Sequence, residues 1–149
     1  MRRDLLRIAT IAVCVGTTFA AERKIGYQDL PPSVQKAMPA EAKGAEIRGY
    51  NRETEKGKTF YEVETMLNGQ SRDLLFDATG VLVEVEEEIA LNSIPSAAKS
   101  AIERRVADGK VNKVERVTKG QSVSYEAEIT SKSGKSSEVA VKPDGKSLN

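Results

Sequence analysis

Two pairs of glutamates offer the arrangement closest to a catalytic one. Each pair follows a tyrosine and has a spacing of two residues: Glu62 with Glu64, and Glu126 with Glu128. Two carboxylates on one surface are the acid and base of many glycoside hydrolases. An alternating strand with one buried side also places polar residues at this spacing. We therefore interpret both pairs as the solvated side of a strand.

The remaining composition argues against catalysis. The chain has no histidine, and its single cysteine, Cys14, lies near the N-terminus. Without histidine the chain lacks the usual general base, the Ser/His and Cys/His nucleophile systems and the commonest zinc ligand. No glycine-rich phosphate loop precedes a helix. We predict that the protein is not an enzyme and has no catalytic residue, metal site or cofactor.

The densest acidic run is residues 84–88, Glu-Val-Glu-Glu-Glu. A calcium loop supplies about six to eight oxygens from Asp, Asn and Glu at set positions around a glycine turn. This run has no such turn. It is therefore predicted to be the charged end of a strand.

The strands that carry these glutamates are the clearest elements of the sequence. Residues 61–67 and 123–129 alternate with a period of two, which is typical of a half-buried antiparallel strand. An earlier strand is expected in each half, at 46–53 and 111–118. The alternation of these earlier strands is imperfect, which suggests a β-bulge or a late start. A further strand is predicted at 81–88.

The helices are marked by proline and by apolar spacing. A helix is expected to open at Leu30-Pro31-Pro32, because proline suits the first helical turn, and to break or kink at Pro39. A second helix follows Ile94-Pro95, with an apolar stripe at helical spacing up to Val106.

The same order of elements recurs 64 residues later: Tyr125 repeats Tyr61, and Ile94 repeats Leu30. We predict two helix-plus-meander repeats, residues 30–91 and 92–149, that form one domain. The predicted fold class is α+β, with one curved antiparallel sheet of about seven strands and both helices on one face. The second repeat ends early, so its last strand is truncated.

The N-terminus has the features of an export signal. Three arginines precede an apolar segment too short to span a bilayer, and Thr18-Phe19-Ala20 suits signal peptidase. We predict a signal peptide over 1–20, a loosely ordered polar lead-in over 21–29 and a periplasmic or secreted protein. The sequence leaves both the general and the twin-arginine export routes open. Loss of the signal changes the formal net charge from +1 to −1. That balance favours neither nucleic acid nor an anionic membrane, and no membrane span is expected after cleavage.

The chain resembles the PepSY-like family, which is grouped with β-lactamase-inhibitor-like proteins. The resemblance covers about residues 28–149, nearly the whole chain after the signal. The motifs that carry it are Leu30-Pro31, Tyr61-Glu62-Val63-Glu64 and Phe76-Asp77-Ala78-Thr79-Gly80 in the first half, and Ile94-Pro95, Tyr125-Glu126-Ala127-Glu128 and Pro143-Asp144-Gly145 in the second. The resemblance implies an exported bacterial protein with a tandem α+β fold. Some relatives inhibit β-lactamases or peptidases.

The sheet face opposite the helices is the candidate binding surface. The predicted partner contacts are sizeable apolar residues set among carboxylates: Phe60, Glu62, Glu64, Met66, Leu75, Leu82 and Glu84. Exposed apolar patches mark many binding sites, although scattered surface hydrophobes or self-association would also explain them. We predict an exported module that binds a protein or peptide of the envelope by this face or by an open sheet edge. The alternative is a sensor domain for a small ligand or cation.

Overall fold

The computed structural model describes residues 20–55 and 57–148. Apart from Ala20, the predicted signal peptide lies outside this part of the chain. The strands are β1 (Ala20–Ile25), β2 (Glu46–Glu55), β3 (Lys58–Leu67), β4 (Gln70–Asp77), β5 (Leu82–Glu88), β6 (Lys110–Lys119), β7 (Ser122–Thr130) and β8 (Ser136–Val141). The helices are α1 (Pro32–Glu41) and α2 (Ser96–Val106), and each follows a short 3-10 turn, Tyr27–Asp29 or Leu91–Ser93.

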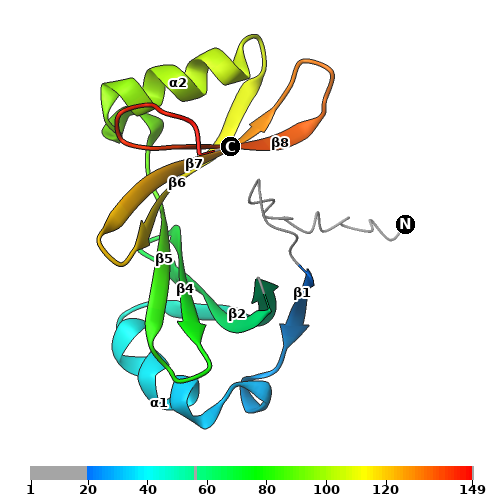
Figure 1. The fold of residues 1–149 in the computed structure, drawn as a ribbon, viewed down its shortest axis with the longest axis vertical. Coiled ribbons are helices and arrows are strands. Elements are labelled where there is room, and N and C mark those ends of the chain that lie inside the picture. The colour runs from blue at the N-terminus through cyan, green and yellow to red at the C-terminus, as the bar shows by residue number, and fades with distance from the viewer. Residues whose placement is uncertain (1–19, 56, 149) are drawn as a thin grey trace.

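All eight strands form one antiparallel sheet in the order of the chain, from β1 to β8 (Figure 1). The predicted α+β class with an antiparallel sheet and two helices is confirmed. The sheet does not close, since β1 and β8 form its two edges. The order of elements fits the predicted duplication, but the duplication itself stays a prediction.

The expected lead-in over 21–29 is the part of the fold that the sequence prediction missed. Its first residues are not loosely ordered but belong to β1. This strand pairs with β2 through Arg23 opposite Arg52 and Ile25 opposite Tyr50. The 3-10 turn Tyr27–Asp29 then leads into α1. The lead-in is polar because an edge strand has few buried positions, and so its sequence carries little strand signal. This strand raises the number from the expected seven to eight.

Each helix covers its own part of the sheet. Val34 and Met38 of α1 pack with Val63, Leu74 and Phe76 of β3 and β4. The break expected at Pro39 does not occur, because α1 continues through it to Glu41, whereas the kink, the other expected outcome, stays a prediction. A proline within a helix removes one backbone hydrogen bond, and here the buried apolar face offsets that loss.

The second helix packs in the same way against β7 and β8. Ala98 and Ile102 are fully buried against Ala127, Val139 and Val141. Tyr125 also belongs to this cluster.

Both helices lie on the same face of the sheet. Val63, Leu74, Val85, Thr118 and Val123 follow one another across β3 to β7 as directly opposed residues, and such residues share a face. Val63 packs under α1, and Val123 packs under α2. Figure 1 shows the sheet strongly twisted and curved, with the two helices at opposite ends of the molecule. Neither helix of the described residues covers the other face, which we call the free face.

Irregularities of strand pairing set which side chains reach this free face, and one of them lies in β1 between Ala20 and Arg23. The predicted bulges are confirmed in β2, between Ile47 and Gly49, and in β6, between Val111 and Lys113. A further irregularity lies between β4 and β5, where Phe76 pairs with Leu82. At the C-terminal end, Val141 and Ser147 form an isolated bridge, which agrees with the predicted stub of a last strand.

Candidate functional site

The free face of the sheet carries a band of carboxylates that crosses every strand from β1 to β8. Pairing register and side-chain alternation place them together. We call this band the acidic face, and it includes the carboxylates of Glu22, Glu53, Glu62, Glu64, Asp73, Glu84, Glu86, Glu88, Glu115, Glu126, Glu128 and Glu138. Lys24, Lys113 and Lys119 lie on the same face. Carboxyl groups therefore outnumber ammonium groups on this surface.

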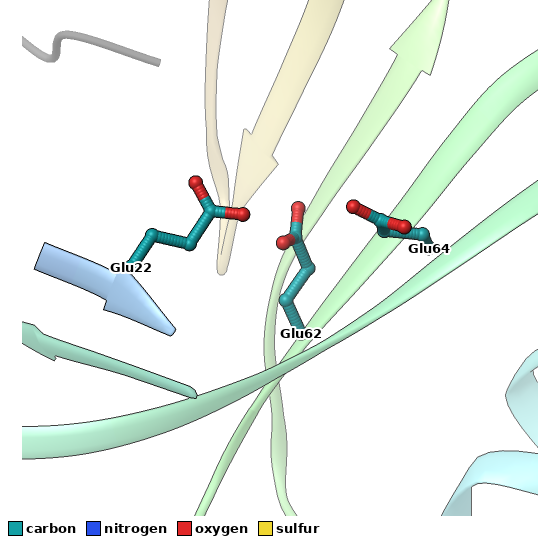
Figure 2. A group of neighbouring side chains, drawn as sticks. All are labelled: Glu22, Glu62 and Glu64. Carbon is teal, nitrogen blue, oxygen red and sulfur yellow. The ribbon is translucent and has the colours of Figure 1, made fainter. Parts of the chain in front are cut away.

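One end of the acidic face is formed by β1, β2 and β3. Glu22 of β1 points toward Glu62 and Glu64 of β3 (Figure 2), and oxygens of the three carboxylates lie within 4.8 Å of one another. Asn51 of β2, which is 3% exposed, donates its amide hydrogens to Glu62 Oε2 at 2.7 Å and to Glu64 Oε1 at 2.9 Å. These bonds fix the directions of two carboxylates that would otherwise repel each other.

The centre of the face holds a second group of three. Asp73, Glu86 and Glu115 come from β4, β5 and β6, and their oxygens also lie within 4.8 Å of one another. Asp73 accepts a hydrogen bond of 3.0 Å from the backbone amide of Thr65. The ammonium of Lys113 lies 2.5 Å from Glu115. One lysine thus partly neutralises this group.

Burial, and then the charges of neighbouring carboxylates, raise several pKa values on this face. Burial raises the pKa of Glu62 to about 8, against the opposing effect of its hydrogen bond from Asn51. Burial and the negative charges of Glu115 and Glu84 raise the pKa of Glu86 to about 10. Both groups are therefore mainly protonated at neutral pH. The predicted solvated strand side is wrong for Glu62, because the curved sheet half-buries it among other acids.

The same effect recurs at the two flanks of the face. Burial, then the charge of Glu22, raises the pKa of Glu53 to about 7. Burial also raises the pKa values of Glu126 and Glu138, whose side chains hydrogen-bond to each other. Such a bond needs a proton on one of the two carboxyls. A positive ligand would replace these protons, since it favours the ionised form.

The structure brings most of the predicted contact residues together. Phe60, Glu62, Glu64, Met66, Leu75 and Glu84 lie on the helix-free face, and Leu75 sits directly between Glu62 and Glu84 on the neighbouring strands. Leu82 does not join them. It packs with the α1 cluster, because the irregularity between β4 and β5 reverses the alternation at the start of β5.

Sequence reasoning missed much of the acidic face. The alternation of β5 could have placed Glu86 beside Glu84, and that of β7 could have added Glu126 and Glu128. Glu22 carried no usable signal, because β1 was not expected to pair. Asn51 could not be identified either, since its role depends on the register between β2 and β3.

Neither helix in the described part of the chain is long and apolar enough to cross a membrane.

No protein-family model matches the sequence, and no curated protein matches it. Solved structures do. A candidate periplasmic protein of Bacteroides eggerthii is 21% identical, with a TM-score of 0.67, over 83% of this chain and 88% of that one. A DUF2874 family protein of Bacteroides uniformis is 18% identical, with a TM-score of 0.64, over 80% and 86%. A BLIP-like protein of Bacteroides fragilis is 21% identical, with a TM-score of 0.59, over 83% and 86%.

The chain has the fold of these proteins. The likeness agrees with the predicted fold relationship to β-lactamase-inhibitor-like proteins, whereas a specific PepSY-like membership stays a prediction. The periplasmic description of the Bacteroides eggerthii protein agrees with the periplasmic or secreted location predicted from the N-terminal segment.

Proposed function

We propose that the protein is a non-catalytic binding module of the bacterial periplasm that uses its acidic face to hold a basic segment of another envelope protein. The observation that carries this proposal is the band of carboxylates across all eight strands, which are half-buried on every strand except β1, where Glu22 is exposed. Several of these carboxyl groups keep a proton while the face is empty, and a row of lysines or arginines would stabilise their ionised form.

Apolar residues on the same face favour a polypeptide over a simple ion. Phe60, Met66 and Leu75 lie among the carboxylates and are partly exposed. A segment that alternates basic and apolar side chains would match both kinds of group. An inhibitor-like role is the narrower form of this function, in which the bound segment belongs to an enzyme. The fold shared with the BLIP-like protein supports that narrower form.

The proposal is tested by calorimetric titration of the mature protein at pH 8 and low salt. The probe is an eight-residue peptide of alternating lysine and leucine, and a glutamate–leucine peptide serves as the control. We expect the basic peptide alone to bind, with an affinity that falls as salt is added. Glu62→Gln should weaken binding about three- to tenfold, as expected for one partly desolvated charge pair. Glu103→Gln removes a charge from α2 and should leave binding unchanged.

Equal binding of the two peptides, or equal effects of the two glutamate variants, would contradict this function. A parallel titration with calcium chloride tests the alternative predicted from the sequence. If calcium binds below the millimolar range and the peptide does not bind, the protein is a cation sensor instead. Calcium binding would also raise the Tm of the protein.

A further inference from the structure

The acidic face has two halves, β1–β3 and β6–β7, in which the strands pair in the same pattern. At one position of this pattern the two halves carry different residues. Directly after its bulge, β2 places Gly49 opposite Glu64, and β6 places Lys113 opposite Glu128. At the next inward position, Asn51 lies opposite Glu62 as Glu115 lies opposite Glu126. Equivalent glutamates on β3 and β7 therefore face a glycine in one half and a lysine in the other.

The β6–β7 half supplies its own cation. Burial works against the charged form of Lys113, but its hydrogen bond to Glu115 and the charges of Glu115, Asp73 and Glu128 outweigh burial. They hold the pKa of Lys113 above its ordinary value. Lys119 is a second internal cation, with its ammonium 2.8 Å from Glu84. A positive side chain is thus stable at this place on the face.

The β1–β3 half has the acids without that lysine. A Cβ atom at Gly49 would lie 2.5 Å from Glu64 Oε2, so the carboxylate occupies the place that a side chain would take. Lys24 runs beside the group, yet among the described residues no ion pair joins it to Glu22, Glu62 or Glu64. Burial and the charge of Glu64 raise the pKa of Glu22 despite Lys24.

We propose that the β1–β3 end of the acidic face is the docking surface for a basic side chain of the partner segment, and that Lys113 fills the equivalent place in the other half from within. This inference rests on the proposed function and adds where on the face the partner's charge is held. Asn51 orients Glu62 and Glu64 for that cation, and Glu22 reaches it from β1.

A matched pair of exchanges tests the inference with the same lysine–leucine peptide. Gly49→Lys gives the first half the internal cation of the second, and only the flexible end of Glu64 must move to make room. We expect it to weaken binding about tenfold. Lys113→Gly opens the second half and should strengthen binding by several-fold. Ser124→Lys adds a charge on the same face at β7, so it controls for net charge and should change affinity less than about twofold. Thermal unfolding of each variant confirms that it is folded.

Two results would overturn this inference while leaving the proposed function in place. One is a Gly49→Lys variant that binds the peptide as tightly as the wild type. The other is an equal loss in Gly49→Lys and Ser124→Lys, which would mean that charge acts over the whole face. A wild-type protein that does not bind the peptide would instead refute the proposed function.

Discussion

Asn51 shows how one residue makes a crowded acidic surface compatible with folding. It is buried in the sheet, and its single amide group donates to two carboxylates on the next strand. The other half of the face has a carboxylate, Glu115, at the place equivalent to Asn51. A carboxylate at this place would need a cation nearby. Lys113 is that cation in the other half.

Replacing Asn51 should therefore destabilise the protein. We expect Asn51→Ala to lower the free energy of unfolding by about 1–3 kcal/mol at pH 7, because two half-buried acceptors lose their donor. Asn112→Ala is the matched control, since Asn112 is exposed and donates one bond, to Thr130 Oγ1. Its loss should be below about 0.5 kcal/mol. Urea unfolding measures both, and equal losses would contradict the role given to Asn51.

The two helices are each held against a turn that contains a glycine with positive φ. Gly80 follows β4 with φ +84°, and a Cβ there would lie 2.6 Å from the backbone oxygen of Ser33 in α1. Gly145 has φ +81° and the same 2.6 Å approach to the backbone oxygen of Ala97 in α2. Ser33 also donates a hydrogen bond of 2.7 Å to the Ala78 oxygen. Each turn thus fixes the start of a helix on its sheet.

Gly80→Ala and Gly69→Ala separate backbone conformation from this contact. Both residues have φ near +80°, but nothing lies within 4 Å of the Cβ position at Gly69. The positive φ should lower the free energy of unfolding of both variants by about 1 kcal/mol. Gly80→Ala should lose about 1–3 kcal/mol more, because backbone atoms cannot give way easily. Urea unfolding measures both variants. Equal losses in the free energy of unfolding would show that the Gly80 turn is not in close contact with α1.

The acidic face couples the stability of the whole molecule to pH. Folding raises the pKa of Glu62 and of Glu86 from 4.5 to about 8 and about 10, and that of Asp73 from 3.8 to about 6, in each case mainly by burial. A group with a raised pKa stabilises the fold fully below its unfolded value and loses that contribution as pH rises through its folded value. These three groups come from the neighbouring strands β3, β4 and β5. Their ionisation at high pH therefore destabilises this part of the sheet.

The protein should accordingly lose stability between about pH 5 and pH 9. Glu86→Gln keeps the shape of the protonated acid without its titration, so its Tm should decline less over this range and exceed that of the wild type at pH 9. Glu103→Gln, on α2, should follow the wild-type curve. Thermal unfolding at a series of pH values tests this, and a wild-type Tm that rises toward pH 9 would refute it.

Bound basic peptide should reduce this loss of stability at high pH. A cation on the face favours ionised carboxylates, so binding should release protons and strengthen as pH rises from about 6 to 9. Calorimetry in two buffers with different ionisation enthalpies would detect this release. No buffer dependence would mean that the peptide lies away from the protonated acids.

The sequence by itself determined the alternating strands, the two helices and the bulges, because periodicity, proline and glycine act locally. It also indicated that Phe60, Glu62 and Met66 share one face, since that follows from a period of two. Residues 20–25 gave no strand signal, and Pro39 does not break α1, one of the two outcomes expected there, because pairing with β2 and packing of α1 outweigh local preference. Tertiary structure alone decided that the glutamates taken as a solvated surface are half-buried acids. Curvature of the sheet brings side chains from separate strands together, and the desolvation and repulsion that follow have no signature in the order of residues.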